Sequence, residues 1–263
     1  MGSMQDIAGE IKDLKEKKNA IILAHSYQIP EVQQIADFVG DSFALSRETR
    51  DSDADMLVFC GVRFMAESAK ILSPDKKVLL PVLDAGCPMA DMVTPEDIRR
   101  LRAQHPGAAV VCYINSSAAV KAECDICCTS SNAVRVVRSL PQRDIVFVPD
   151  RNLGQYVAGQ VPEKRIILYA GYCPVHNRTT PGQARAARAA HPEALLLVHP
   201  ECPREVTQLA DYVDSTAGIV EYAKRSDRRE FIIGTEIGIF HALTRDNPDK
   251  VFHPLVPDFM CPD

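Results

Sequence analysis

The sequence has no block of basic residues, no long apolar run and no apolar core at its N-terminus. Lysine and arginine number 30 against 35 acidic residues, and the net charge of −5 argues against binding to nucleic acid or to an anionic membrane. No apolar stretch approaches the roughly 20 residues that span a bilayer, and the first residues lack the hydrophobic centre of a secretory signal. We therefore expect a cytoplasmic protein with neither a membrane nor a nucleic-acid partner.

Cysteine is what the sequence does have, with nine in 263 residues. Disulfides are disfavoured in the cytosol, and an odd number of cysteines fits poorly with a full disulfide framework. We therefore expect these residues to be core thiols, metal ligands or catalytic groups. Hydrophobic residues make up 46% of the chain and charged residues 25%, so it can bury a core as soluble globular proteins do.

Three segments of the chain read alike, each with a short apolar run, a polar turn and two helix-like stretches. They begin at Ala20, Ala108 and Ala194. Their apolar runs, which read as buried parallel strands, end 88 and 86 residues apart, at His25, Tyr113 and His199. The regular spacing indicates an internal repeat.

Further markers recur at fixed distances within each copy. A hydroxyl residue follows the strand end by 17 positions, at Ser42, Ser130 and Thr216. A second apolar strand ends 36 positions after it, near Gly61, Pro149 and Thr235. Each copy then closes with Cys-Pro, at Cys87, Cys173 and Cys261. Because strands that alternate with helices form parallel sheets covered on both faces, we predict an α/β fold. Its three homologous three-layer α/β/α domains (1–87, 88–173 and 174–263) are related by pseudo-threefold symmetry, with the active site at the centre.

The Cys-Pro cysteines are the candidate metal ligands. Cys-Pro occurs four times, more often than nine cysteines and 18 prolines would give by chance, and it is familiar around iron–sulfur ligands. Three of the four, Cys87, Cys173 and Cys261, hold equivalent positions, which a pseudo-threefold axis would bring to one point. Three thiolates on a cubane cluster leave one iron open, and Lewis-acid catalysis needs such an open position. We therefore predict a single iron–sulfur cluster.

A competing motif is Cys124-x-x-Cys127-Cys128, which contains the only CxxC of the chain and would suit zinc or redox chemistry. It lacks a second half. The repeat alignment pairs its first two cysteines with residues of the other copies: Asp37 and Gly40, Asp211 and Asp214. We interpret these thiols as structural, near a helix start. We interpret His176, three residues after Cys173, as a core histidine or as one that supports the site.

Polar side chains gather where each first strand ends. The pairs are His25 and Tyr27, Tyr113 and Asn115, and His199 and Glu201. Their period-two spacing points both members of a pair to the same side, and sites in parallel sheets lie beyond the carboxyl ends of strands. Each hydroxyl taken singly could be a plain helix cap, but helix starts also favour anions. Three hydroxyls in register beside three thiolates predict a substrate with carboxylates or phosphate.

At these residues the sequence resembles the quinolinate synthase family, over essentially the whole chain. The resemblance rests on motifs such as AHSYQIPEVQQIADFVGDS, INSSAAVKAECDICCTSSNA, GYCPVH, HPECP and GTEIGIFHAL. It implies three α/β/α domains around a [4Fe–4S] cluster bound by the cysteines selected above. It also implies condensation of iminoaspartate with dihydroxyacetone phosphate to quinolinate in NAD biosynthesis, and a functional link to the enzyme that produces iminoaspartate.

The resemblance also implies roles for individual residues. Substrate contacts are implied for His25, Ser42, Tyr113, Asn115, Ser130, His199, Glu201 and Thr216. Tyr27 matches the catalytic tyrosine of the family. Glu201 is our candidate acid/base, because a carboxylate beside a metal can shuttle protons, and Tyr27 and His199 are expected to orient intermediates or relay protons. Two alternatives stay open: another hydro-lyase with the same open cluster, and a non-catalytic cluster carrier or redox sensor.

Overall fold

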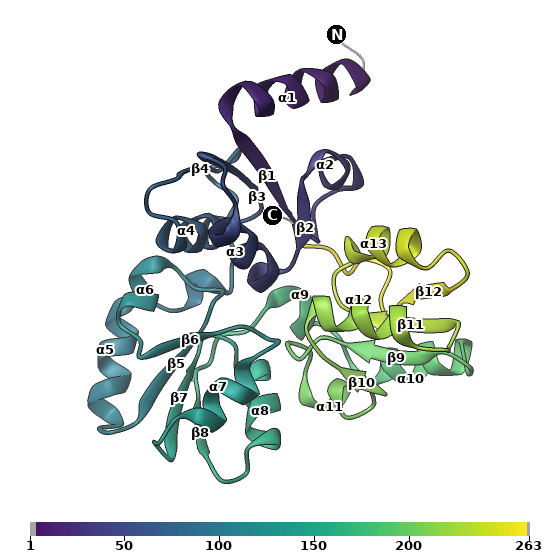
Figure 1. Ribbon diagram of the computed structural model, residues 1–263. Helices are drawn as coiled ribbons and strands as arrows, with labels where there is room; N and C mark the ends of the chain where they lie inside the picture. Colours follow the sequence, from purple (N-terminus) through teal and green to yellow (C-terminus); the bar gives the residue numbers. More distant parts are fainter. Residues whose placement is uncertain (1–3, 262–263) are drawn as a thin grey trace. The chain divides into compact units, whose positions relative to one another are not determined.

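The computed structural model describes residues 4–261 and contains three four-stranded sheets, each built only from parallel strands (Figure 1). The strands of the first sheet are β1 (Ala20–His25), β2 (Phe38–Gly40), β3 (Met56–Cys60) and β4 (Lys77–Leu79). Those of the second are β5 (Ala109–Tyr113), β6 (Ile126–Cys128), β7 (Asp144–Val148) and β8 (Arg165–Leu168). Those of the third are β9 (Leu195–Val198), β10 (Tyr212–Val213), β11 (Glu230–Gly234) and β12 (Val251–Pro254).

The three sheets share one strand order, which is β2-β1-β3-β4 in the first, β6-β5-β7-β8 in the second and β10-β9-β11-β12 in the third. The predicted α/β fold is thereby confirmed. Each sheet lies within one of the three predicted domains, although the boundaries between those domains stay predictions.

Helices precede and connect the strands of every sheet. In the first segment they are α1 (Met4–Lys18), α2 (Pro30–Ile35), α3 (Ser42–Asp51) and α4 (Arg63–Leu72). In the second they are the short 3₁₀-helix η1 (Ala90–Met92), α5 (Pro95–Gln104), α6 (Ala118–Ala122), α7 (Ala133–Ser139) and α8 (Arg151–Gln160). In the third they are α9 (Pro174–Asn177), α10 (Pro181–Ala190), α11 (Arg204–Thr207), α12 (Thr216–Arg225) and α13 (Ile239–Asp246). Within residues 4–261, no helix combines the length and the apolar character that crossing a membrane requires.

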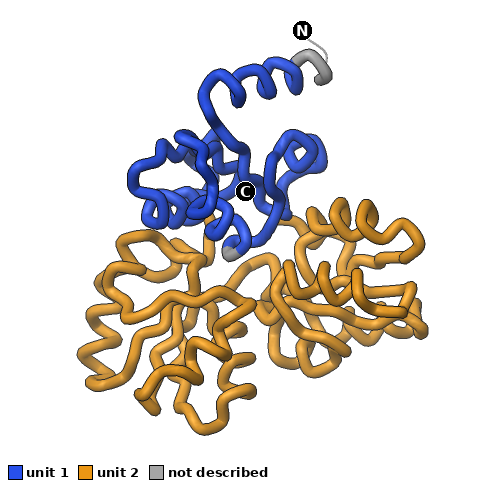
Figure 2. Tube along the Cα trace, in the orientation of Figure 1, with its two compact units in different colours: residues 1–86, 263 blue, residues 87–262 orange. Residues whose placement is uncertain are grey.

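The chain divides into two compact units (Figure 2). The first runs to Gly86 and contains the first sheet, and the second starts at Cys87 and contains the second and third sheets. All three candidate ligand cysteines therefore belong to the second unit. The pseudo-threefold relation among the three copies stays a prediction.

Burial on both faces explains the continuous apolar runs of the strands. In the second sheet, Val111 and Phe147 pack in one cluster with residues of α7 and α8. Val110 and Val146, their neighbours along the strands, pack in another cluster with residues of α5 and α6. Successive side chains of a strand point to opposite faces, so a strand covered by helices on both faces needs an apolar residue at almost every position. The third sheet follows the same plan, with α10 and α11 on one face and α12 and α13 on the other (Figure 1).

An aspartate anchors the first strand of every copy. The backbone N–H groups of Ile22, Val110 and Leu196 each donate, over 2.7 Å, to the aspartate 15 residues later: Asp37, Asp125 and Asp211. A basic side chain from the preceding helix pairs with the same carboxylate at 2.6, 2.8 and 2.6 Å, from Lys15, Arg102 and Arg188. The same three-part contact in all three copies supports their homology independently of the strand order.

These aspartates correct one detail of the repeat alignment. Asp125, and not Cys124, corresponds to the anchoring aspartates of the other two copies. Cys124 follows α6, whereas Cys127 and Cys128 belong to β6, so their predicted position near a helix start is wrong. Cys128 is buried and Cys127 is exposed. These two neighbours in β6 point to opposite faces of the sheet, as successive side chains of a strand do, so one faces solvent and the other faces the core.

Replacing Asp125 by alanine should lower the free energy of unfolding by about 1–3 kcal/mol, because the buried Val110 N–H would lose its acceptor. The matched control is Glu96→Ala, which removes one exposed ion pair with Arg99 and should change stability by less than about 0.5 kcal/mol. Urea unfolding of both variants measures the difference. Equal losses would show that the repeated aspartate is no anchor.

Candidate functional site

Each candidate ligand cysteine follows a loop that one recurring backbone hydrogen bond ties to the start of a helix. The donors and acceptors are Arg63 and Ala85, Arg151 and Gly171, and Ile237 and Phe259, at 2.9, 2.8 and 2.8 Å. Every acceptor lies two residues before a Cys-Pro cysteine. At Gly171 this approach leaves no room for a side chain, because a Cβ there would lie 2.6 Å from the carbonyl oxygen of Pro149. The repeat thus fixes the backbone at the same point before Cys87, Cys173 and Cys261.

In the second and third copies a buried carboxylate also holds the cysteine's own backbone. The N–H of Cys173 donates to Asp150 at 2.9 Å, and the N–H of Cys261 donates to Glu236 at 3.3 Å. Each carboxylate also accepts from a backbone N–H near the start of the following helix. Sequence reasoning missed both residues, although they share one repeat position, 37 residues after the strand end, where the first copy has Val62.

The three thiols occupy one region of the second unit. Cys87 and Cys173 pack against one hydrophobic cluster, and Cys173 and Cys261 pack against another. Burial raises the pKa of Cys87 to about 12, and the charges of Glu201 and Cys261 add to this rise. Burial also raises the pKa of Cys173, with contributions from Glu201 and Cys87. The three thiols therefore lie close enough together for the ionisation of one to disfavour that of another, while their role as ligands stays a prediction.

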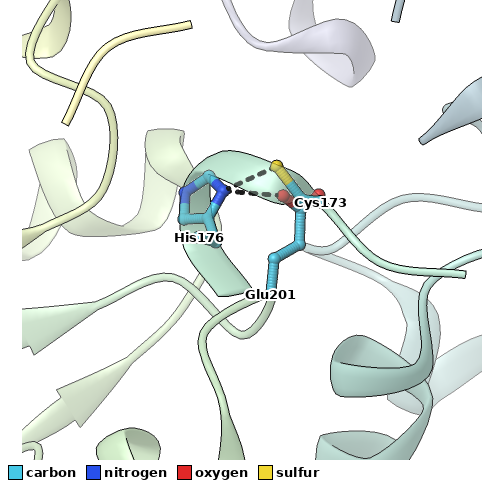
Figure 3. A group of neighbouring side chains, drawn as sticks. All are labelled: Cys173, His176 and Glu201. Atoms are coloured by element: carbon cyan, nitrogen blue, oxygen red, sulfur yellow. Dashed lines mark hydrogen bonds and ion pairs between the residues drawn. The ribbon is translucent and has the colours of Figure 1, made fainter. Parts of the chain in front are cut away.

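His176 links one of these cysteines to Glu201 (Figure 3). Its Nδ1 lies 2.9 Å from Oε2 of Glu201 and 3.2 Å from Sγ of Cys173. Its Nε2 lies 2.9 Å from Oγ1 of Thr235. The ring is only 2% exposed, and both of its nitrogens have polar partners. Of the two interpretations offered for His176, a histidine that supports the site agrees with these contacts.

Glu201 is a buried carboxylate that stays charged. Burial by itself would raise its pKa, but the nearby rings of His199 and His176 and hydrogen bonds from His176 and Tyr113 lower the pKa to about 2. The Tyr113 hydroxyl donates to Oε1 over 2.7 Å, from 88 residues away in the sequence. With 3% exposure, Glu201 has little contact with water, so these donors supply the compensation that a buried charge requires.

The backbone of Glu201 is held as firmly as its side chain. Its carbonyl accepts from Nδ2 of Asn152 at 2.9 Å, and its N–H donates to Nδ1 of His199 at 3.3 Å. The rings of His176 and His199 lie 4.9 Å apart between centroids. Two histidines and one tyrosine thus surround a single carboxylate at the carboxyl ends of β5 and β9.

Three of the predicted site residues belong to the first unit. His25 ends β1, and the N–H of Tyr27 donates to its Nδ1 at 3.3 Å. Glu201 and His199 make the same backbone-to-ring bond in the third copy, so the equivalence of these pairs extends to their local conformation. Ser42 begins α3. The contribution of these residues to a site shared with the second unit stays a prediction.

The predicted hydroxyl residues are not the caps of their helices in the first and third copies. Ser215 caps α12 by accepting from the N–H of Gly218 at 3.2 Å, which leaves Thr216 as the first helical residue. Asp41 makes the corresponding bond ahead of Ser42. The alternative of a plain helix cap is therefore wrong for Ser42 and Thr216. In the second copy, Ser130 lies between β6 and α7.

Asn115 presents an unused acceptor. Its side-chain oxygen Oδ1 is buried and has no hydrogen-bond partner in the part of the chain that the structure describes. Buried polar atoms are almost always paired. This oxygen therefore suits a donor group on a bound ligand.

A family model described as "Quinolinate synthetase A protein" matches residues 9–263 of the chain. The sequence is 57% identical over 260 residues to a quinolinate synthase of Caldicellulosiruptor saccharolyticus, which covers 99% of this chain and 86% of the relative. It is 56% identical over 252 residues to a quinolinate synthase of Alkaliphilus metalliredigens, with 96% of this chain and 83% of the relative covered. It is 57% identical over 252 residues to one of Methanoregula boonei, with the same coverage.

Replacing Tyr113 by phenylalanine should cost about 1.5–3 kcal/mol of stability, because a buried carboxylate oxygen of Glu201 would lose its donor. Tyr156→Phe is the matched control, since the Tyr156 hydroxyl lies 3.4 Å from its acceptor, the Val213 carbonyl, and should contribute less than about 1 kcal/mol. Denaturant midpoints of the two variants give the comparison. A loss for Tyr113→Phe no larger than the control's would mean that Glu201 does not depend on this bond.

Proposed function

Because the chain belongs to the quinolinate synthetase A family, we propose that it condenses iminoaspartate with dihydroxyacetone phosphate to form quinolinate, phosphate and water. This reaction places it in NAD biosynthesis. The observation that carries the proposal is the threefold recurrence of the tied Cys-Pro loop, together with the charge of Glu201 near two of its thiols, Cys87 and Cys173.

We propose further that Cys87, Cys173 and Cys261 hold a [4Fe–4S] cluster. Thiolates on a single zinc ion lie about 2.3 Å from it and hence no more than about 4.6 Å from one another. Within residues 4–261, the ligand atoms of Cys173, His176 and Glu201 all lie within 4.8 Å of one another, whereas the three cysteines do not form such a group. Wider spacing suits a cluster, which distributes its ligands over separate irons. When bound, its iron without a protein ligand supplies a Lewis acid.

Glu201 is the acid/base of this proposal, because a carboxylate beside a metal can shuttle protons. Its lowered pKa means that it begins as the base, in its carboxylate form. His199, whose Nδ1 accepts the Glu201 N–H, and Tyr27, which matches the catalytic tyrosine of the family, orient intermediates or relay protons.

Substrate binding follows from the remaining polar groups. Iminoaspartate carries two carboxylates and an imine N–H, and its partner carries a phosphate. The buried Oδ1 of Asn115 accepts from the imine N–H. The hydroxyls of Ser130 and Thr216, with that of Ser42 in the first unit, donate to the carboxylate and phosphate oxygens.

Cys87→Ala, Cys173→Ala and Cys261→Ala should each lose the brown colour, the bound iron and quinolinate formation. Removing a residue that only hydrogen-bonds to a metal ligand costs roughly 10–100-fold in metal affinity. Removing a ligand itself should therefore cost more. Anaerobic iron and sulfide counts, the visible spectrum and quinolinate production from the two substrates measure these effects. Cys127→Ala, which removes an exposed thiol, is the control and should keep all three properties. Bleaching by Cys127→Ala with retention by the Cys-Pro variants would overturn the assignment.

Adjacent hydroxyls at the start of α12 separate capping from substrate binding. Thr216→Val should weaken substrate binding roughly 10- to 150-fold, which corresponds to a charge-assisted hydrogen bond of about 1.5–3 kcal/mol, and should leave the cluster spectrum unchanged. Ser215→Ala removes the cap, so it should lower stability by about 1 kcal/mol without changing substrate saturation. Saturation curves and melting temperatures of both variants provide the measurement. Unchanged saturation in Thr216→Val would remove this residue from the substrate site.

A further inference from the structure

A second group of metal-ligating side chains lies in the third sheet, apart from the site described above. His191 directly follows α10, Glu230 is the first residue of β11, and His253 lies in β12. Glu230 lies at the opposite end of β11 from Gly234, after which the chain continues with Thr235, the partner of His176. The group is therefore built from three elements that meet at the other end of the strand.

The ligand atoms of these three side chains converge. Oε1 of Glu230 lies 2.9 Å from Nε2 of His253 and 3.4 Å from Nδ1 of His191. The three ligand atoms all lie within 4.8 Å of one another. Nitrogen and oxygen ligands of a tetrahedral zinc ion bind at about 2.0–2.2 Å and so lie roughly 3.3–3.6 Å apart. The observed separations are close to this spacing.

The second copy shows what this corner of the fold looks like when it cannot bind a cation. Asp144 holds the position of Glu230, and Arg165 pairs with it across β7 and β8 through two side-chain bonds, one of them 2.9 Å long. In the third copy the position of Arg165 is taken by Val251, opposite Glu230. A permanent guanidinium charge is thus absent from this position in the third copy. Two imidazoles, which can act as neutral metal ligands, contact the carboxylate instead.

We propose that His191, Glu230 and His253 form a binding site for a divalent transition-metal ion, with Zn²⁺ as the best match. Imidazole and carboxylate together suit Zn²⁺ better than Mg²⁺ or Ca²⁺, which prefer oxygen ligands. Two histidines and one glutamate make three protein ligands and leave a position for water. The site is distinct from the predicted cluster, because it uses none of the Cys-Pro cysteines.

Metal binding depends on the exposure of the three side chains and on the orientation of the two imidazole rings. The side chains of His191, Glu230 and His253 are 32%, 35% and 24% exposed, so an ion and its water ligand can reach them. The two rings are stacked, with centroids 3.5 Å apart and planes 16° from parallel. Ring nitrogens bind metals in the plane of the ring, so one ring turns about its Cβ–Cγ bond when the ion enters. The bound ion then connects the end of α10 to β11 and β12.

Zinc titration of the cluster-loaded protein by calorimetry tests the site, in a Cys127→Ser background that removes an exposed thiol. The parent should show a zinc-binding event that His253→Ile weakens at least about 10-fold. Isoleucine is chosen because the second copy has Ile167 at this position. Ile167 lies opposite Val146 in the second sheet, and His253 lies opposite Ile232 in the third. Glu230→Gln, a second variant at a strand end, should weaken the same event, and a given zinc concentration should raise the melting temperature of the parent more than that of either variant.

The control is His105→Ala, because His105 follows α5 as His191 follows α10, next to the arginine-paired Asp144. It should leave the zinc titration unchanged. Substitution of Co²⁺ should give an absorption spectrum without thiolate charge-transfer bands. The proposal is overturned if the parent shows no zinc-binding event, if His253→Ile and Glu230→Gln bind zinc as the parent does, or if the Co²⁺ spectrum shows thiolate ligation.

Discussion

A backbone N–H at or just before the start of a helix donates to a carbonyl two residues before a cysteine, and the chain makes this bond three times. The bond fixes main-chain atoms, so it places the cysteine whatever side chains surround it. Asp150 and Glu236 then hold the amide groups of Cys173 and Cys261 directly. Ligands that are far apart in the sequence can therefore be positioned by local geometry alone, provided that the copies themselves are alike.

Glu201 is the ionised carboxylate beside these cysteines, and its charge contributes to the raised pKa values of Asp150 and Cys173. A buried charge is costly in a low-dielectric interior unless donors or cations offset it. Tyr113 and His176 supply the donors for Glu201 itself.

The fold could be predicted from the sequence because its signals are periodic. Apolar runs at a fixed spacing predicted three parallel α/β segments, and all three sheets have the same strand order. The alignment of the copies to the exact residue was harder to predict. Cys124 and Asp125 are adjacent, and only the hydrogen bond from the Val110 N–H identifies Asp125 as the anchor. The contacts of His176 and the bond between Tyr113 and Glu201 could not be predicted from the sequence. They join side chains of different copies, or of different loops, through tertiary packing that no local pattern encodes.

The bond between Tyr113 and Glu201 has a second consequence, for folding. It joins the end of β5 to the loop after β9, and Asn152 adds a bond from α8 to the same loop. These contacts connect the second copy to the third through the very groups that serve the candidate site. Loss of either sheet would remove donors from the buried Glu201 carboxylate or expose it to solvent, so the two sheets depend on each other for stability. Residues 87–261 should accordingly melt as one cooperative block.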